Sequence, residues 1–129
     1  EVVEAPEWLR ARLALPPGAQ VRHLICLHLA DGTPWQHEDR WINLALLPQA
    51  LDADFSASGP TEWLMSQIPF SAVEISISAT AADASLAAHL DCAPGEPLLM
   101  TDRSTRGNDQ MVTYARLVPR PGHRMTTRY

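Results

Sequence analysis

The sequence predicts an α+β fold in which an antiparallel sheet of about six strands is flanked by short helices. Apolar and polar residues alternate with a period of two in several segments, as expected for strands with one buried face. Most of these segments are joined by turns containing glycine or asparagine, which favours hairpins and an antiparallel sheet. The 129 residues are 46% hydrophobic and 19% charged, a composition that can bury the core of one domain.

The first third of the chain predicts a β-hairpin preceded by a short lead-in. Pro16-Pro17-Gly18 ends the lead-in, and Asp31-Gly32 supplies a tight turn because glycine adopts a positive φ at little cost. Alternation places Val21, His23, Ile25 and Leu27 on one face of the first strand and Arg22, Leu24, Cys26 and His28 on the other. The expected elements are a helical or irregular lead-in at 6–15, a strand at 20–29, a turn at 30–33 and a strand at 34–43.

The rest of the chain predicts short helices and further strands. Val73, Ile75 and Ile77 alternate with polar residues, which indicates a half-buried strand. Pro94-Gly95 separates an alanine-rich helix from a second hairpin. The expected elements are a short helix at 44–50, a polar loop at 52–59, a helix at 60–67, a strand at 70–80, a helix at 82–90, strands at 97–105 and 110–118 joined by a turn at 107–109, and an edge strand at 123–129.

Charge and composition exclude several classes of protein. The chain has 15 acidic and 10 basic residues, a net charge of −5, and every basic residue is an arginine. This acidic balance argues against direct binding of this chain to a nucleic-acid backbone. No apolar stretch is long enough for a membrane span, and no signal peptide is visible, so we expect a cytoplasmic protein that does not bind membranes. Cys26 and Cys92 form no CxxC pair and are expected to be small buried groups.

No motif for covalent catalysis, phosphate binding or metal binding occurs in the sequence. His23 and His28 lie on opposite faces of their strand, so they do not chelate one metal ion together. We therefore expect a protein that is not an enzyme and that uses neither a cofactor nor a metal.

The densest polar cluster is the segment 37–40, His-Glu-Asp-Arg. Alternation sends Glu38 and Arg40 to one face and His37 and Asp39 to the other, and the hairpin brings His28 close to the cluster. A charge inside a sheet is costly unless it is paired or bound to a ligand. From the spacing alone, a solvated face or an internal Glu–Arg pair is favoured over a ligand site.

Three further residues have both a structural and a functional interpretation. Tyr114 and Arg116 share one face of the strand at 110–118, where an arginine fork suits a carboxylate; alternatively Tyr114 packs in the core and Arg116 points to solvent. Thr61 stands at the start of a helix, where it caps the helix, helps to hold an anion, or does both. Arg103 and Arg106 flank Ser104-Thr105 on a hairpin arm and are expected to be surface charges.

An ordered set of residues from Ala14 to Tyr129 resembles a known family. The chain is similar to the UTRA effector-binding domain of GntR-type bacterial transcription regulators, and within it to the HutC subfamily, the histidine-utilisation repressor group. The residues that carry this resemblance are His23, His28, Asp31-Gly32, Pro34, Gln36, Glu38-Asp39-Arg40-Trp41, Asn43, Asp54-Phe55, Pro60-Thr61, Trp63-Leu64, Ala81-Ala82-Asp83, Leu90, Gly95-Glu96-Pro97, Leu99, Arg103, Thr113, Ala115-Arg116-Leu117, Pro121-Gly122 and His123-Arg124.

The resemblance implies a chorismate-lyase-like fold with a ligand cavity. It implies that residues 14–129 are the effector-binding domain and residues 1–13 the remnant of an interdomain linker. It further implies a homodimer, and an N-terminal winged helix-turn-helix domain, absent from this chain, through which alone operator DNA is bound.

The resemblance also implies which residues bind the ligand. His28 and Cys26 replace arginines of phosphosugar-binding relatives, which argues against a phosphosugar. Glu38, Thr61, Tyr114 and Arg116 match positions that contact ligands or typify the histidine-utilisation group. The implied effector is urocanate or a similar small carboxylate. Arg116 or Arg40 with Thr61 suits its carboxylate, Glu38 with His28 or Tyr114 suits its imidazole, and Trp35 or Trp41 suits stacking on the ring.

We therefore expect the effector-binding and dimerisation domain of a repressor, with ligand-binding residues His28, Glu38, Arg40, Thr61, Tyr114 and Arg116. One alternative is a chorismate-lyase-like enzyme on the same fold, which turnover of chorismate would reveal. The other is a dimerisation module without a ligand, in which substitution of Arg116 or Glu38 would leave operator release unchanged.

Overall fold

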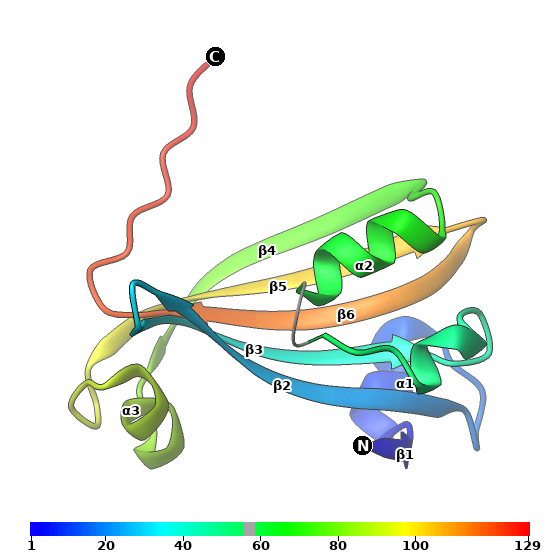
Figure 1. Cartoon of the computed structure of the whole chain (residues 1–129), viewed down its shortest axis with the longest axis horizontal. Helices are drawn as coiled ribbons and strands as arrows, with labels where there is room; N and C mark the ends of the chain where they lie inside the picture. The colour runs from blue at the N-terminus through cyan, green and yellow to red at the C-terminus, as the bar shows by residue number, and fades with distance from the viewer. Residues whose placement is uncertain (56–58) are drawn as a thin grey trace.

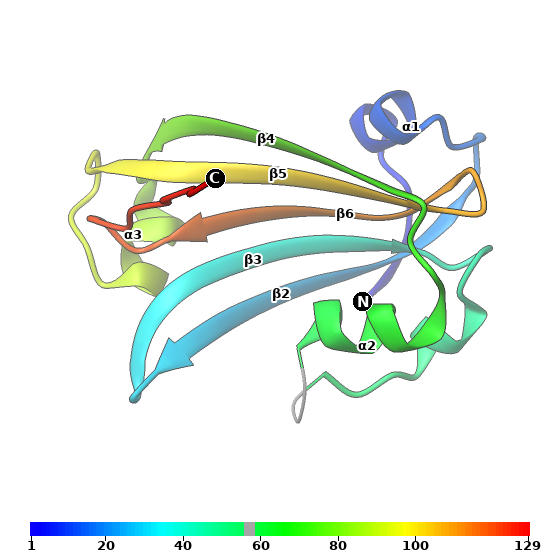
Figure 2. The same cartoon turned by 90° about the horizontal axis from the view of Figure 1, so that it is seen from above.

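The computed structural model describes residues 1–55 and 59–129 and contains one six-stranded antiparallel sheet. The strands are arranged in the order β1-β2-β3-β6-β5-β4, which confirms the predicted α+β class. Figures 1 and 2 show the strands running side by side along the length of the molecule. The strands are β1 (Val2–Glu4), β2 (Gln20–Ala30), β3 (Thr33–Asn43), β4 (Ala72–Ala81), β5 (Pro97–Gly107) and β6 (Gln110–Pro119).

Two hairpins form the centre of the sheet, as the turn residues predict. Asp31 and Gly32 join β2 to β3 with φ angles of 52° and 77°, a conformation suited to a two-residue turn between twisted strands. Asn108 and Asp109 join β5 to β6 with φ angles of 52° and 60°. The pairing of β3 with β6 joins the two hairpins and places residues 36–42 next to residues 113–119.

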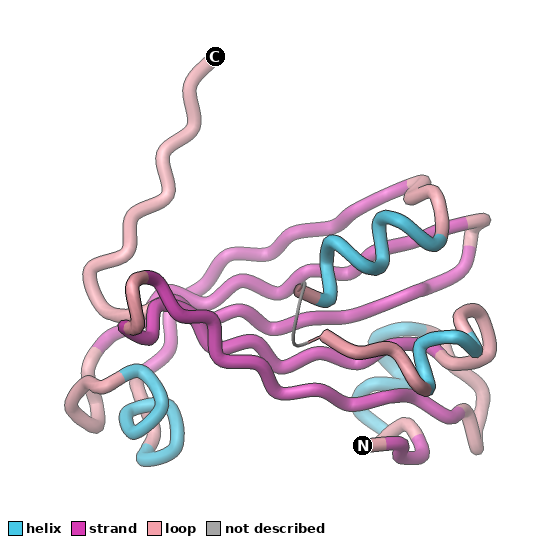
Figure 3. Tube along the Cα trace, viewed as in Figure 1, coloured by secondary structure: helices cyan, strands magenta, loops and turns pink. Residues whose placement is uncertain are grey.

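The helices cover both faces of the sheet, and Figures 1 and 3 show α2 on one face and α1 with α3 on the other. α2 packs through Leu64 near Ile42 of β3 and Val112 of β6, whereas α1 packs through Leu9 near Trp41 and Tyr114. We call these the α2 face and the α1–α3 face. The helices are α1 (Glu7–Leu13), α2 (Pro60–Gln67), α3 (Ala84–Leu90) and a 3₁₀ turn (Pro48–Leu51).

The N-terminal residues, expected to be the remnant of a linker, are part of the folded domain. β1 pairs with β2 through Val3 and Val21, a strand that the sequence did not predict. Leu9 and Leu13 of α1 are 0% and 4% exposed in the core beneath the sheet. A three-residue strand is too short to show alternation, which is why the pattern alone did not reveal it.

Two expectations about strands are wrong. Residues 123–129 form no strand, because Pro119 and Pro121 lack backbone donors and the chain leaves the sheet after the Arg120 amide bonds to the Trp35 carbonyl at 2.7 Å. The strand β4 is not half-buried: it lies at the edge of the sheet, and Ile75 and Ile77 are 55% and 56% exposed. α2 packs over the β2, β3 and β6 side instead of over β4.

The other predicted elements differ mainly in extent. Only Pro48–Leu51 of the helix expected at 44–50 is helical, as a 3₁₀ turn. The polar loop expected at 52–59 includes residues 56–58, which lie outside the described part of the chain. Cys26 and Cys92 are free and partly exposed, which differs from their expected burial.

Candidate functional site

The six residues expected to bind a ligand lie on opposite faces of the sheet. Glu38 stands opposite Leu117 of β6, and the next residue, Asp39, stands opposite Arg116. Since alternate side chains point to opposite faces, Glu38 and Arg116 project away from each other. The α2 face carries His28, Glu38 and Arg40, with Thr61 on the helix above them, whereas the α1–α3 face carries Tyr114 and Arg116.

On the α2 face, Arg40 is the centre of a buried hydrogen-bond network. Its Nε donates to Glu38 Oε2 at 2.5 Å, its Nη1 to Thr113 Oγ1 at 3.1 Å and its Nη2 to Thr61 Oγ1 at 3.0 Å. His28 Nε2 lies 2.8 Å from the other oxygen of Glu38. The Arg40 and Glu38 side chains are 3% and 4% exposed. The internal Glu–Arg pair considered from the spacing is therefore present, and its hydrogen bonds link β2, β3 and β6 to α2.

The network keeps Glu38 ionised. Burial on its own raises the pKa of this carboxyl, but the charge and hydrogen bond of Arg40 and the hydrogen bond of His28 outweigh burial, so the pKa lies below its usual range. The site therefore holds a carboxylate and a guanidinium beneath α2, each compensating the buried charge of the other.

A cavity of about 310 Å³ opens beside this network, and we call it the α2 cavity. It contains three of the expected ligand residues, His28, Glu38 and Thr61, while Arg40 lies behind them. Trp35 forms another wall, with its ring centroid 6.1 Å from that of His28. The full lining is His28, Trp35, Gln36, Glu38, Gly59, Pro60, Thr61, Glu62, Arg103 and Leu117.

Arg103 of β5 is a residue of this cavity that was expected to be a surface charge. It is partly buried, and among the residues that the structure describes it has no hydrogen-bond or ion-pair partner. Its cross-strand neighbours are Ile75 and Ala115, neither of which carries a charge. Alternation along 97–105 was the available signal, because Arg103 shares its face with Thr101 and Thr105, but the pairing of β5 with β6 was needed to use it.

The α1–α3 face carries a second polar network, centred on Asp102. Its Oδ1 accepts from the Tyr114 hydroxyl at 2.7 Å and from Arg116 Nε at 3.0 Å. Arg12 Nη1 donates to the same hydroxyl at 3.0 Å and lies 3.8 Å from Asp102 Oδ2. Sequence reasoning missed both Arg12 and Asp102, since no local pattern connects α1 with β5. The six expected residues therefore do not form one site.

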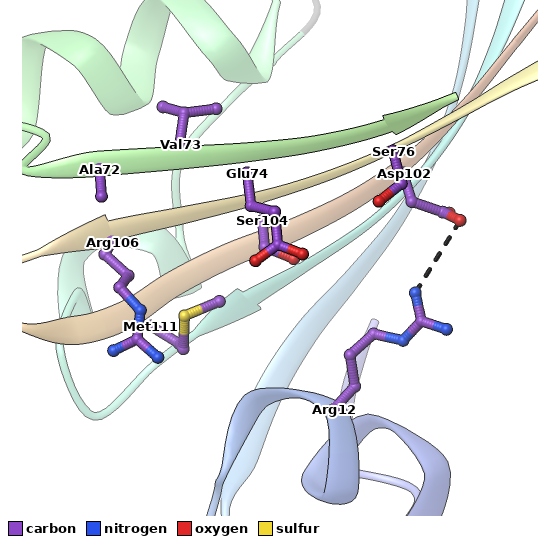
Figure 4. Close-up of a pocket in the computed structure, with 9 residues that line it drawn as sticks. All are labelled: Arg12, Ala72, Val73, Glu74, Ser76, Asp102, Ser104, Arg106 and Met111. Carbon is purple, nitrogen blue, oxygen red and sulfur yellow. Dashed lines mark ion pairs between the residues drawn. The ribbon is translucent and has the colours of Figure 1, made fainter. Parts of the chain in front are cut away.

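Figure 4 shows Arg12 and Asp102 pointing toward each other as an ion pair, and both line a cavity of about 480 Å³. Burial raises the pKa of Asp102, but hydrogen bonds from Tyr114 and Arg116 and the charges of Arg116 and Arg12 outweigh it, so the pKa is lowered. Asp102 is therefore an ionised carboxylate whose charge is paired with those of Arg12 and Arg116. Arg116 also lines a different cavity of about 320 Å³, together with His37 and His89.

The two tryptophans expected to stack on a ligand ring are also separated by the sheet. Trp41 packs among Trp8, Tyr114 and His23 on the α1–α3 face, with the His23 ring stacked on it at a centroid distance of 4.6 Å. Trp35 alone of these two lines the α2 cavity. Of the alternatives for holding a ring, Trp35 with His28 and Glu38 is the set that the fold brings together.

Two further observations concern metals and membranes. Within residues 1–55 and 59–129, no group of three or more histidine, cysteine or acidic side chains is placed to hold a metal ion. No helix in the described chain is both long enough and apolar enough to span a membrane.

A family model, sequence relatives and solved structures all match this chain to the same family. The UTRA domain model matches residues 1–123. The histidine utilization repressor of Pseudomonas putida is 34% identical over 118 residues, 91% of this chain and 48% of that protein. That of Klebsiella aerogenes is 30% identical over 118 residues, 91% of this chain and 49% of that protein. The chain thus spans about half the length of these relatives.

Solved structures agree. The C-terminal domain of the histidine utilization repressor from Pseudomonas syringae has a TM-score of 0.93 at 30% identity, covering 100% of this chain and 92% of that one. The ligand-binding domain of a GntR-family regulator from Bordetella bronchiseptica has a TM-score of 0.84 at 20% identity, covering 99% and 87%, which shows a shared fold. The family consists of regulator domains and not of enzymes, so the expected lack of catalytic activity is confirmed. This chain belongs to the UTRA domain family of transcriptional regulators.

Proposed function

We propose that this chain is the effector-binding and dimerisation domain of a cytoplasmic repressor that senses urocanate or a similar small carboxylate. The observation that carries the proposal is the α2 cavity, where His28, Glu38 and Thr61 converge beside Trp35. The matched relatives are named histidine utilization repressors, which supports histidine-utilisation genes as the target. The family resemblance implies a separate winged helix-turn-helix domain that contacts operator DNA, and the net charge of −5 on this chain agrees with that division.

The cavity offers complementary groups to an imidazole ring. Glu38 is held as a carboxylate, and each of its oxygens has a second lone pair that accepts an N–H from a ligand. His28 has a second ring nitrogen besides the one next to Glu38, which interacts with the other polar edge of the ligand. Trp35 supplies an aromatic surface for the ring.

Thr61 suits the carboxylate end of the ligand. Its oxygen accepts from Arg40, so its own hydroxyl proton is free to be donated to a ligand oxygen. Tyr114 and Arg116 are not part of this proposal, because their network occupies the other face of the sheet. Ligand binding would change the affinity of the repressor for DNA by a coupling free energy of about 1–3 kcal/mol. The coupling would arise from a change in the relative orientation of the effector-binding and DNA-binding domains.

Calorimetric titration of the chain with urocanate tests the proposal. We expect saturable binding at one site per chain, and a rise in unfolding free energy of about 2.7 kcal/mol at a ligand concentration one hundred times Kd. Thr61→Val, which removes the hydroxyl, should weaken binding by about tenfold, whereas Thr61→Ser, which keeps it, should bind nearly as the parent chain does.

Light scattering on the same sample should give the mass of a dimer.

Absence of both heat and a melting shift at millimolar urocanate would exclude this effector. Equal affinities for the Thr61→Val and Thr61→Ser variants would place the ligand away from α2.

A further inference from the structure

We infer that Arg103 is the counter-charge that holds the carboxylate of the ligand in the α2 cavity, and so determines its specificity for a planar monocarboxylate. The inference rests on the proposed function, because it names the charged partner of that ligand. It concerns a residue of β5 that faces the cavity from the side opposite His28, across β6 and β3 in the strand order.

Arg40 is one of the two arginines expected to bind the carboxylate. All three nitrogens of Arg40 already donate to the protein, to Glu38, Thr113 and Thr61. The Arg40 side chain is 3% exposed, so a ligand in the cavity meets its partners and not its guanidinium. Arg40 does not line the cavity, and its charge is already matched by that of Glu38.

Arg116, the other arginine expected to bind the carboxylate, is on the wrong face. It donates to Asp102 and to the Tyr114 hydroxyl at 3.0 and 3.3 Å on the α1–α3 face. The strands of the sheet therefore separate it from Thr61 and Glu38. Arg22, which shares the α2 face with Arg40, donates to the Ala50 and Ala53 carbonyls and does not line the cavity.

Arg103 has the properties that the other two lack. It lines the α2 cavity, it is partly buried, and no acceptor in the described chain satisfies its guanidinium. The side chains that flank it on the same face of β4 and β6 include Ile75, Ala115 and Leu117, so no neighbouring acid on these strands neutralises it. A guanidinium on an apolar surface presents parallel N–H donors that match the two oxygens of a carboxylate.

The two acidic residues that line the cavity, Glu38 and Glu62, do not pair with Arg103. Glu38 is bonded to Arg40 and His28, and Glu62 is exposed in the first turn of α2 with no ion pair to Arg103. Glu38 therefore offers acceptor oxygens to a ligand, whereas Arg103 offers a positive charge that no described side chain neutralises. A ligand with a ring N–H at one end and a carboxylate at the other fits this polarity, and one arginine suits a monocarboxylate better than a phosphate.

The first test measures Kd for urocanate and for its uncharged methyl ester by calorimetry. Arg103→Gln should weaken urocanate binding at least tenfold, and Arg103→Lys should restore part of the loss because the charge remains. The ester should bind the parent chain more weakly than urocanate does, and Arg103→Gln should not change its affinity. Arg106→Gln is the matched control on the same strand, and should bind urocanate within twofold of the parent.

Unchanged urocanate affinity in Arg103→Gln would overturn the inference. An equal loss for the acid and the ester would also overturn it, since that pattern indicates a structural role rather than recognition of the carboxylate.

A second test separates this inference from the proposed effector. The Nε–Hε resonance of Arg103 is followed by NMR while acrylate, the carboxylate half alone, is added to the parent chain. A saturable shift at Arg103 that Arg106 does not share supports an anion site even if urocanate itself does not bind. If urocanate binds but neither urocanate nor acrylate shifts the Arg103 resonance, the proposed effector is retained and the role of Arg103 is rejected.

Discussion

Adjacent residues of β6 serve different faces of the sheet. Thr113 Oγ1 accepts from Arg40 at 3.1 Å and donates to the Trp41 carbonyl at 2.8 Å, which supports the wall of the α2 cavity. The next residue, Tyr114, is fully buried and donates to Asp102 on the α1–α3 face. A shift of one residue in the pairing of β3 with β6 would therefore exchange the two networks.

Asp102→Asn tests the separation of the two faces. Asn keeps an oxygen that accepts hydrogen bonds, but it lacks the negative charge that strengthens those from Tyr114 and Arg116 and that attracts Arg12. We therefore expect a loss of about 1–2 kcal/mol in urea unfolding. Urocanate affinity should change less than twofold, because Asp102 is not on the α2 face. Asp109→Asn is the control, since Asp109 is exposed in a turn and Asn tolerates its φ of 60°. A large loss of affinity in Asp102→Asn would place ligand contacts on the α1–α3 face.

Local alternation predicted which residues share a face but not which strands meet. It correctly grouped Tyr114 with Arg116 and Glu38 with Arg40. It left Arg40 and Arg116 as equal candidates to join Thr61, because that choice depends on contacts between residues far apart in the chain, such as Arg40 with Thr61. Asp102 and Arg12 were missed for the same reason, since their network joins α1 to β5 and β6.

At the scale of elements, α2 and the segment after it fit closely against the end of the β5–β6 hairpin. Gly107 lies beneath this segment, and a Cβ at that position would stand 2.9 Å from the Pro69 carbonyl oxygen and 3.2 Å from Ile68 and Val112. A backbone oxygen cannot move aside as a flexible side chain does. This position therefore fixes how close the connection between α2 and β4 approaches the sheet.

Gly107→Ala should accordingly displace that connection and destabilise the chain by about 1–3 kcal/mol in urea or thermal unfolding. Gly59→Ala is the matched control, because its Cβ would lie 3.9 Å from His28, an ordinary contact, and the loss of glycine before α2 costs no more than about 1 kcal/mol. Equal stability losses in the two variants would show that the segment adapts freely at Gly107.

The elements that sequence reasoning missed lie at the edges of the sheet. β1 has only three residues and pairs with β2 alone, so its position depends on a partner distant in sequence. The expected strand at 123–129 had suitable residues, but the chain leaves the sheet after Arg120. The central strands β2, β3, β5 and β6 were predicted, because their hairpin turns and alternation are local properties.

At the scale of the whole molecule, the sheet separates a buried carboxylate, Glu38, from a partly buried one, Asp102, and arginine holds each of them ionised. Burial raises the pKa of both Glu38 and Asp102, and in each case hydrogen bonds and positive charge outweigh burial and lower it. A carboxyl whose pKa is lower in the folded chain than in the unfolded chain stabilises the fold at pH values above its unfolded pKa. That stability is lost as the pH falls through the folded pKa.

The sign of this effect gives a prediction for acid unfolding. The ordinary pKa of a glutamate is 4.5, so the stability due to Glu38 should be complete well above pH 4.5 and should decline below it. Glu38→Gln removes the titrating group and leaves Arg40 buried without its counter-charge, so we expect a loss of about 3 kcal/mol at pH 7. The loss should shrink as the pH falls, because the parent chain protonates Glu38 and approaches the variant.

Urea unfolding of both chains between pH 7 and pH 3 measures this convergence. Glu74→Gln, at an exposed position of β4, is the control and should run parallel to the parent chain. A residual acid dependence should remain in Glu38→Gln because Asp102 titrates with the same sign, and the double substitution with Asp102→Asn should reduce it further. A stability difference between Glu38→Gln and the parent that stays constant over this range would mean that the Glu38–Arg40 pair does not couple protonation to folding.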